Sequence, residues 1–481
     1  MILKIILVLI LILLAAFIAL VLARTFTFRP EDTQEKVYPE MVFDREEAVE
    51  KLRALVRCRT VSDYDRSKED EAEFEKLIGL LPELYPNVTE KCELTRFEDR
   101  GLLFHWKGKD PSAEPAVFMA HYDVVPVEEE FWDHDPFSAE IADGAIWGRG
   151  TLDTKNTFNG VMDAADNLIA SGFVPERDIY MAFSGGEEVM GPGARHIARW
   201  FKEKGITPFF VLDEGGAVVE GVFPGVKGPC GLIGIAEKGM CNMTFTVNSD
   251  GGHASAPSPH TPVGILSMAC AKMEANPFKR HFTAPVLGMF DVLGRRSSFL
   301  YRMIFANLWC FGGLLDMICK KRGGELNALV RTTVAFTQMK GSLAPNVIPP
   351  SASMTANLRL NPEDSVAGAI RYAQETIKDS RVKITADGME PSPISRTDCR
   401  GWEIISDAVR GAWPGTVVAP YLMVQCSDSR HYADVSDRVY CFSAADMTDD
   451  ERHSIHGNNE HIRVETVGRA VEFFMRIMKD C

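Results

Sequence analysis

The sequence lacks the cysteine pairs that structural zinc sites and disulfide frameworks use. Its eleven cysteines are scattered from Cys58 to Cys481, and no two of them form a Cys-x-x-Cys pair. Thiolate zinc sites need closely spaced pairs, and small disulfide-bonded domains usually carry an even number of cysteines. The cysteines therefore argue against both classes.

Positive charge is also scarce. The 481 residues include 52 Lys and Arg against 67 Asp and Glu, which gives a formal net charge of −15. Beyond the first turns no stretch is basic enough to neutralise a run of phosphates, so we expect no nucleic-acid partner. A serine hydrolase is not indicated either, because no Gly-x-Ser-x-Gly elbow follows a predicted strand.

One long apolar run is present near the amino terminus. Residues Ile5–Leu22 are apolar without interruption, close to the ~20 residues that a helix needs to cross a ~30 Å hydrocarbon core. A signal peptide, the alternative, usually has an apolar region of only ~7–15 residues and a small-x-small cleavage site. We therefore expect residues 1–24 to be an uncleaved, single-pass membrane anchor. Basic residues flank the run on both sides, so the sequence leaves its orientation open.

The remaining length suggests two domains. From about Met41 helical stretches alternate with short apolar runs that end in polar, glycine-containing loops, the pattern of an α/β sheet protein. The runs Ala116–Ala120, Ile179–Phe183 and Phe209–Leu212 are continuously apolar, which predicts strands covered by helices on both faces. Chemistry is then expected just past the carboxyl ends of these strands.

Between about residues 235 and 388 the order of predicted elements changes to strand, helix, two strands, helix and strand. This βαββαβ order is typical of a ferredoxin-like unit. We therefore predict a catalytic domain in two parts, 40–234 and 391–481, with a lid and dimerisation domain, 235–390, inserted between them.

The inserted region also contains an extra segment, 278–329, whose stretch Phe299–Cys319 is largely apolar and is flanked by basic residues. Exposing each large apolar side chain to water costs ~1.5–3 kcal/mol, so we expect something to cover it. Two interpretations stay open. The segment packs on the lid or on a dimer partner, or it lies near the membrane and guides hydrophobic substrates into the site.

Three sequence motifs carry histidine or carboxylate groups near predicted strands. Asp123 follows His121 by two residues and can hold its second ring nitrogen, as a metal-ligating histidine requires. A glycine-rich turn delivers Asp153, a candidate for bridging two cations. The adjacent Glu187 and Glu188 would repel each other unless a cation or a shared proton compensates, so one can bind metal while the other acts as general base. Taken singly, these motifs have plainer interpretations: a surface histidine, a helix N-cap and two solvated glutamates.

Two further groups strengthen the interpretation of these motifs as parts of one metal site. The pair Asp213-Glu214 follows the next predicted strand, and His456 arrives from the returning segment near the carboxyl terminus. Oxygen and imidazole ligands without thiolates suit Zn²⁺ in an open catalytic site, and two such ions can hold a shared hydroxide. Co²⁺ or Mn²⁺ fits the same ligands.

From about Phe43 to the carboxyl terminus the chain resembles the di-zinc peptidase family that includes aminoacylase-1, carboxypeptidase S and the hydrolases of N-fatty-acyl amino acids. The resemblance rests on motifs that occur in the family's order: HYDVVP, WGRGTLDTK, SGGEE, LDEGG, NVIP, SDSRHY and IHGNNE. It implies a zinc-peptidase sheet domain with an inserted lid. It also implies hydrolysis of the amide bond before a free amino-acid carboxylate.

The resemblance implies a role for each candidate residue. The metal ligands would be His121, Asp153, Glu188, Glu214 and His456, with Asp153 bridging two Zn²⁺ ions. Glu187 would be the general base and Asp123 the partner of His121, while Asp213 remains an alternative to Glu214.

The same resemblance assigns roles around the substrate. His253 would stabilise the oxyanion, often across a homodimer interface made by the lid. Asn346 and Arg359 would bind the substrate carboxylate, with Arg430 as a second cation. The substrate itself stays open between a short peptide, as for carboxypeptidase S, and an N-acyl amino acid. A catalytically dead binding module would need a broken ligand or base, and none is visibly broken.

Overall fold

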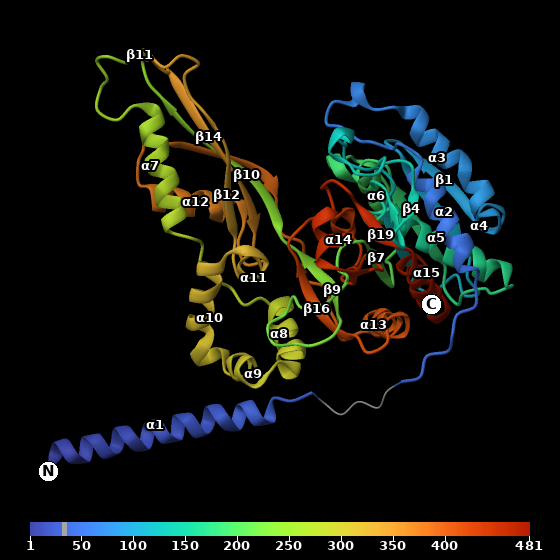
Figure 1. Ribbon diagram of the computed structural model, residues 1–481, viewed down its shortest axis with the longest axis horizontal. Helices are drawn as coiled ribbons and strands as arrows, with labels where there is room; N and C mark the ends of the chain where they lie inside the picture. Colours follow the sequence, from blue (N-terminus) through green and yellow to red (C-terminus); the bar gives the residue numbers. More distant parts are fainter. Residues whose placement is uncertain (31–35) are drawn as a thin grey trace.

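A large mixed sheet forms the centre of the molecule in the computed structural model, which describes residues 1–30 and 36–481 (Figure 1). Its strand order is β1-β2-β6-β3-β7-β17-β9-β8-β18, and β16 pairs with β9. The bounds of these strands are β1 Glu93–Phe97, β2 Gly101–Trp106, β3 Ala116–His121, β6 Ile179–Ser184, β7 Phe210–Asp213, β8 Val218–Val219, β9 Cys230–Glu237, β16 Val417–Met423, β17 Val439–Cys441 and β18 Asp446–Met447. The three predicted strands are confirmed as β3, β6 and β7, which run parallel to one another.

Helices cover both faces of the large sheet, which explains why its central strands are almost continuously apolar up to the polar residue that ends each one. Phe118 and Ala120 of β3 face one cluster of buried side chains, while Val117 and Met119 face another on the opposite side. The first face packs against helices α5 and α15, and the second against α6. The helices of this domain are α2 Arg45–Val56, α3 Glu71–Leu84, α4 Pro86–Lys91, α5 Lys155–Ala170, α6 Gly193–Lys204, α13 Arg400–Ala412, α14 Asp449–Ser454 and α15 Val464–Asp480.

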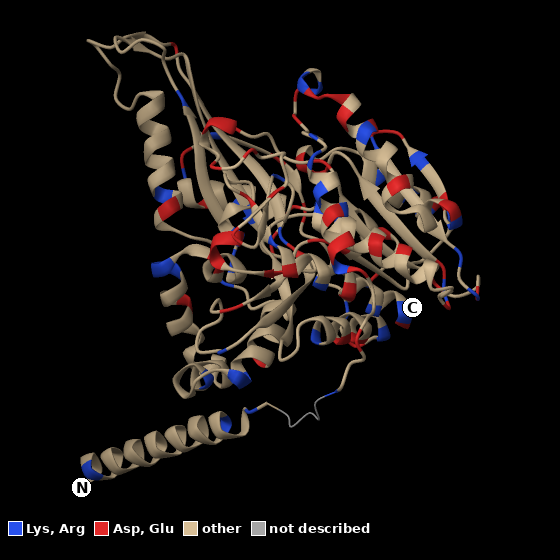
Figure 2. Cartoon of the chain, turned by 45° about the vertical axis from the view of Figure 1, so that its right-hand side comes forward, with Lys and Arg blue, Asp and Glu red and all other residues tan. Residues whose placement is uncertain are grey.

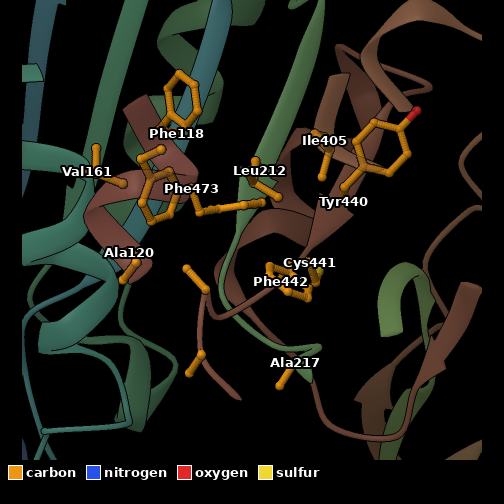
Figure 3. Close-up of a cluster of buried hydrophobic side chains, with 14 of the residues drawn as sticks. Phe118, Ala120, Val161, Leu212, Ala217, Ile405, Tyr440, Cys441, Phe442 and Phe473 are labelled. Atoms are coloured by element: carbon orange, nitrogen blue, oxygen red, sulfur yellow. The ribbon is translucent and has the colours of Figure 1, made fainter. Parts of the chain in front are cut away.

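The core beneath the sheet joins segments that are distant in sequence. Figure 3 shows Phe473 of α15 beside Leu212 of β7, with Phe118 and Val161 close by. Each of these four side chains is essentially inaccessible to solvent, and burying one contributes ~1.5–3 kcal/mol. The carboxyl-terminal helix is therefore an integral part of the domain that begins more than three hundred residues earlier. A small sheet of β19 (His461–Arg463), β5 (Ala145–Trp147) and β4 (Glu140–Ala142) links the same two parts of the chain.

A second, smaller domain rises from the large one (Figure 1). Its sheet has the antiparallel order β12-β14-β10-β15, in which the first strand of the unit lies between the third and the fourth. Alternate side chains of β10 and β14 pack under the two helices into a separate core. The elements are β10 Gly239–Asn248, α7 Pro262–Ala275, β12 Thr333–Lys340, β14 Ser351–Leu360, α12 Val366–Ile377 and β15 Lys383–Met389, with a two-residue pair, β11 Gly252–His253 and β13 Val347–Ile348, at the tip.

The extra segment folds into four helices within the described residues: α8 Ala284–Arg296, α9 Phe299–Ala306, α10 Leu308–Arg322 and α11 Gly324–Val330. Helix α8 lies on β16, and its buried side chains join the core of the large domain, not that of the small one. Phe278, at the start of the segment, is the part that packs in the small domain. The interpretation that the segment packs on the lid therefore describes only its first residues.

The amino-terminal run forms helix α1, Ile2–Thr27, which extends three residues beyond the predicted anchor. Its most apolar 18-residue window has a mean hydropathy of 3.7, so the helix is long and apolar enough to cross a membrane, and a signal sequence has the same properties. Most of its side chains are exposed.

Candidate active site

The candidate residues meet at one edge of the large sheet because β3, β6 and β7 are parallel and end there. His121 is the last residue of β3, Glu187 and Glu188 lie in the short 3-10 turn that follows β6, and Glu214 directly follows β7. The loop after β7 runs tightly against β9. A Cβ on Gly216 would lie 1.9 Å from the carbonyl oxygen of Leu232, so only glycine fits at this position.

Asp153 lies between two histidines. Its Oδ1 is 2.9 Å from Nε2 of His121, and its Oδ2 is 3.0 Å from Nε2 of His456. The same Nε2 of His456 is 3.0 Å from Oε2 of Glu188. Ligand atoms of His121, Asp153 and Glu188 all lie within 4.8 Å of one another. A carboxylate that faces a different imidazole with each oxygen has the arrangement needed to bridge two cations.

Negative charge is concentrated around these histidines. Burial and the neighbouring Asp153 raise the pKa of Glu188 to about 7, against the opposing effect of His456. Burial likewise raises the pKa of Glu187 well above its usual range, with Asp428, Glu214 and Glu188 adding to the shift and His121 opposing it. Hydrogen bonds to Asp153 and Glu188 raise the pKa of His456 to about 10. Carboxylates so placed need compensating positive charge.

The donor set fits a divalent metal such as zinc. Imidazole nitrogens and carboxylate oxygens are first-choice zinc ligands, and thiolates are missing from the cluster among the described residues. Oε1 of Glu188 is buried without a hydrogen-bond partner, an arrangement that is costly unless another group satisfies the oxygen. A metal ion would satisfy that oxygen and offset the clustered charge.

Asp123 connects the first histidine to the glutamate turn. Its Oδ1 lies 3.4 Å from Nδ1 of His121, and its two oxygens accept the backbone N–H groups of Glu187, at 3.1 Å, and Glu188, at 3.2 Å. Asp123 is fully buried. Nδ1 of His121 donates to the backbone carbonyl oxygen of Asp123 at 3.1 Å, so the backbone and the nearby carboxylate of this one residue hold the ring, and the carboxylate fixes the position of both glutamates.

The structure separates the two candidates of the LDEGG motif. Both oxygens of Asp213 are engaged, since Oδ1 accepts the backbone N–H of Glu214 at 2.9 Å and Oδ2 accepts that of Ser429 at 2.8 Å. Glu214 instead lines a cavity of about 490 Å³ together with Asp153, Glu187, Glu188 and His456. A larger hollow, of about 1710 Å³, lies between other elements and contains none of these residues.

Known proteins resemble this chain in both sequence and fold. Residues 117–480 match the model of peptidase family M20/M25/M40. The chain belongs to this family. It is 34% identical over 479 residues to the N-fatty-acyl-amino acid synthase/hydrolase of Xenopus tropicalis, covering 97% of this chain and 93% of the relative. It is also 34% identical over 442 residues to the probable carboxypeptidase S-like 2 of Dictyostelium discoideum, covering 90% and 85%.

A solved structure supports the same fold. The M20 family metallo-carboxypeptidase Sso-CP2 of Sulfolobus solfataricus superposes with a TM-score of 0.65 at 15% identity, covering 91% of this chain and 99% of the other. Together with the family match, this shows that the chain is a hydrolase of the metallopeptidase and amidohydrolase class with a mixed α/β fold.

The plainer interpretations of the motifs do not hold in this M20/M25/M40 peptidase. His121 is only 2% exposed and is not a surface residue. Asp153 does not cap α5, because Thr154 is the N-cap and no side chain makes the capping hydrogen bond. The side chain of Glu188 is 5% exposed and is not a solvated glutamate.

The residues predicted to contact the substrate fall into two groups. His253 and Asn346 lie together at the tip of the small domain, where the backbone N–H of Ala254 donates to the carbonyl oxygen of Asn346. This tip is the end of the small domain farthest from the large sheet (Figure 1). His253 is exposed, and its Nδ1 contacts the hydroxyl of Ser255 at 2.7 Å. Within one chain, these two residues do not reach the metal-type cluster, which consists of His121, Asp153, Glu188, Glu214 and His456.

The two arginines lie nearer to the large domain. Arg359 is next to the last residue of β14, and its Nη1 donates to Sγ of Cys426, a residue of the cavity wall. Arg430 is bonded through Nη2 to the carbonyl oxygen of Glu390 and lies 3.9 Å from Glu237. Arg430 is not among the described residues that line the cavity.

Sequence reasoning missed the residue that organises the Asp153 turn. Glu460 is fully buried, and its Oε1 accepts the backbone N–H groups of Leu152, at 2.8 Å, and Asp153, at 3.2 Å. Its Oε2 accepts the N–H of Gly150, at 3.0 Å, and Nη1 of Arg149, at 2.7 Å. Arg149 in turn donates to the carbonyl oxygen of Gly457, next to His456. Glu460 is the last residue of the IHGNNE motif, but nothing in the local sequence shows that its carboxylate turns inward.

A second residue without a sequence-based assignment is Asp428. It is buried and accepts a short hydrogen bond from the hydroxyl of Ser184 at the end of β6. Burial raises its pKa to about 7, the bond from Ser184 opposes this shift, and Asp213 adds to it. Asp428 is also among the charges that raise the pKa of Glu187.

Replacing Glu460 by glutamine is expected to destabilise the enzyme by about 3–5 kcal/mol, because it leaves the buried Arg149 without its charge partner. Urea unfolding measured by circular dichroism tests this. Glu465→Gln is the control, since that side chain is 59% exposed and its change should stay within ~0.5 kcal/mol. Equal stability of the two variants would show that the buried pair does not hold the turn.

Proposed function

We propose that this enzyme hydrolyses the amide bond that precedes a free carboxyl-terminal amino acid, using two zinc ions held by His121, Asp153, Glu188, Glu214 and His456. The observation that carries the proposal is the position of Asp153 between two imidazoles, beside a buried oxygen of Glu188 that has no partner. Co²⁺ or Mn²⁺ would occupy the same oxygen and nitrogen ligands.

When bound, the ions would supply an acidified water and polarise the scissile carbonyl. Glu187 takes a proton from the attacking water as its oxygen bonds to the carbonyl carbon. The same carboxyl group then delivers that proton to the amide nitrogen as the carbon–nitrogen bond breaks. The raised pKa of Glu187 makes its carboxylate a stronger proton acceptor than a solvent-exposed glutamate, as removal of a proton from water requires. Asp123 keeps the ring of His121 and the turn at Glu187 in fixed positions relative to each other during both steps.

We propose that the small domain is a lid and dimerisation domain. His253 and Asn346 lie at its far tip, so a second copy of the chain is the simplest source of an oxyanion-stabilising imidazole at each site. Arg359 is proposed to receive the substrate carboxylate, because its guanidinium lies at the cavity wall beside Cys426. Arg430, whose guanidinium lies 3.9 Å from Glu237, is proposed as a second cation for the substrate carboxylate.

Two substrate classes fit this chemistry, a short peptide and an N-acyl amino acid. The relatives' names point to both classes: one is a probable carboxypeptidase S-like protein and the other an N-fatty-acyl-amino acid synthase/hydrolase. The wall of the cavity includes the side chains of Leu152, Val219, Leu232, Tyr421, Met423 and Met447. Because these side chains offer apolar contact and few hydrogen bonds, they favour a hydrophobic acyl group over a second peptide unit. We further propose that α1 remains attached as a membrane anchor.

Glu187→Gln is expected to abolish turnover while both metals stay bound, because the amide keeps the shape of the side chain but cannot take the proton. A general base contributes ~10²–10⁴ to the rate. Metal content and kcat are measured on the same preparation. Glu188→Gln is the matched variant, since loss of a ligand charge should lower the metal content. A Glu187→Gln enzyme with two metals and less than a tenfold loss of rate would show that another group is the base.

His253→Ala is expected to lower kcat with little change in melting temperature, because the side chain is exposed at the tip of the small domain. Mixing this variant with Glu187→Gln tests the origin of the imidazole. Activity in the mixed dimers, which neither variant has alone, would show that His253 acts on the partner's site. Unfolding of His253→Ala would instead indicate a structural role.

For full-length enzyme in detergent, kcat/KM is expected to rise with acyl length in a series of N-acyl amino acids from acetyl to palmitoyl. Each buried methylene contributes up to ~0.8 kcal/mol, which corresponds to about fourfold in rate. Blocked dipeptides with the same terminal amino acid provide the comparison. A clear preference for dipeptides would identify the enzyme as a peptidase and exclude the fatty-acyl class.

A further inference from the structure

Helices α9 and α10 form an apolar elbow, residues 299–322, next to the amino-terminal helix. The two helices meet at Asn307, where their axes bend by 114°. Together they are, like α1, long and apolar enough to enter a membrane, as a broken span or a re-entrant pair. Figure 1 shows the elbow at the end of the molecule along which α1 runs.

The elbow is attached to α1 by specific contacts. The side-chain amide of Asn307 donates to the carbonyl oxygen of Val21 and to the hydroxyl of Thr25, each at 3.3 Å. Nε of Arg24 donates to the carbonyl oxygen of Ala306 at 3.1 Å. Aromatic pairs add to these bonds, with ring centroids 5.8 Å apart for Phe17 and Trp309 and 5.7 Å apart for Phe26 and Phe299.

These contacts set the depth of the elbow relative to the apolar run of α1. Val21 and Phe17 lie inside the run Ile5–Leu22, not beyond its end. At a rise of ~1.5 Å per residue, Phe17 lies ~10 Å along the helix axis from Arg24, the first charged residue after the run. If α1 crosses a bilayer, Trp309 therefore lies beside a part of the helix that is surrounded by lipid.

The bend at Asn307 is suited to such surroundings because its polar groups have partners. The backbone N–H of Asn307 donates to the carbonyl oxygen of Ile304 at 3.1 Å, and its own carbonyl oxygen accepts the N–H groups of Cys310 and Phe311 at 3.0 Å. Unsatisfied backbone groups are what normally exclude irregular chain from the hydrocarbon region. Asp316, the acid on α10, is paired with Lys320 and Arg331.

The outer surface of the elbow is largely apolar, and basic residues flank it; the half-buried Arg302 of α9 donates to the carbonyl oxygen of Ser297. Large side chains protrude from the elbow, including Leu300, 68% exposed, Met317, 60% exposed, and Trp309, 56% exposed. Lys320, Lys321 and Arg322 form the last turn of α10. Figure 2 shows α1 without charge along most of its length and with blue residues at its ends. Apolar residues bordered by cations match the layering of a bilayer surface.

We propose that the apolar elbow is a second membrane contact, which enters the same leaflet that α1 leaves and holds the catalytic domain against the lipid surface. The occupant of this surface is thus the bilayer. This inference rests on α1 being a membrane-spanning helix. The helix that follows the elbow, α11, reaches the site: its Glu325 lines the cavity and accepts a hydrogen bond from the hydroxyl of Tyr421 at 2.8 Å. Under the proposed function, lipid-dissolved substrates would then enter beside the membrane.

Trp309 is a probe that the chain already carries. It is the exposed one of the seven tryptophans, all of which lie in described residues, and α1 has none. Full-length enzyme is reconstituted into phosphatidylcholine vesicles with or without mid-chain bromine, which quenches tryptophan within the hydrocarbon. We expect a quenched component in the native enzyme that is lost in Trp309→Phe. Equal quenching of the two proteins would overturn the proposal.

A charged variant gives an independent test. Leu300→Glu combined with Met317→Glu is expected to abolish the Trp309 component by driving the elbow out of the lipid, while Leu94→Glu, exposed on β1 of the large domain, leaves it unchanged. Unchanged quenching in the double variant would contradict the proposal. If a second copy of the chain covers the elbow instead, brominated lipid does not quench Trp309, and the Trp309 emission shifts with protein concentration in detergent. That result would also overturn the proposal. None of these measurements uses a substrate, so they stand apart from any failure of the proposed activity.

Discussion

The concentration of negative charge at the carboxyl edge of the large sheet is the constraint on which the candidate site depends. Asp123, Asp213 and Asp428 are buried there, and Glu187, Glu188 and Glu214 line the adjoining cavity. Two imidazoles offset only part of this charge. Burial and the neighbouring carboxylates therefore leave several of these carboxyl groups with raised pKa values. Bound metal ions would therefore act on stability as well as on chemistry, because they bind the folded arrangement and not the unfolded chain.

The division of the chain into two domains separates the candidate machinery. The metal-type cluster, the candidate base and their supporting residues Asp123 and Glu460 all belong to the large domain, which fixes their mutual distances. His253 and Asn346 belong to the far tip of the small domain. Under the proposed function, these two residues reach the cluster only from a second copy or through a large closing movement. Such an arrangement assembles the full set of groups only when the parts meet around a substrate.

The segment between α7 and β12 connects helix α1 with the cavity of the candidate site. Its helix α8 is buried against β16 of the large domain, its apolar elbow packs on α1, and α11 reaches the cavity wall. These contacts make the segment part of the catalytic domain's architecture, even though the sequence places it within the inserted unit. The large apolar surface of this segment is thus covered in part by α1 and in part by the core of the large domain.

The sequence alone determined the central strands β3, β6 and β7, the order of elements in the small domain, the apolar helix α1 and the family, because these depend on local periodicity and on short motifs. It also brought His121, Asp153, Glu188 and His456 together as one set through their positions after predicted strands and through family resemblance. Only the tertiary structure decided that Asp213 is engaged by backbone N–H groups while Glu214 faces the cavity, that Glu460 turns inward, that His253 lies away from the cluster and that α9 packs on α1. Each of these depends on which distant backbone group or side chain a residue meets, and the local sequence holds no record of a partner hundreds of positions away.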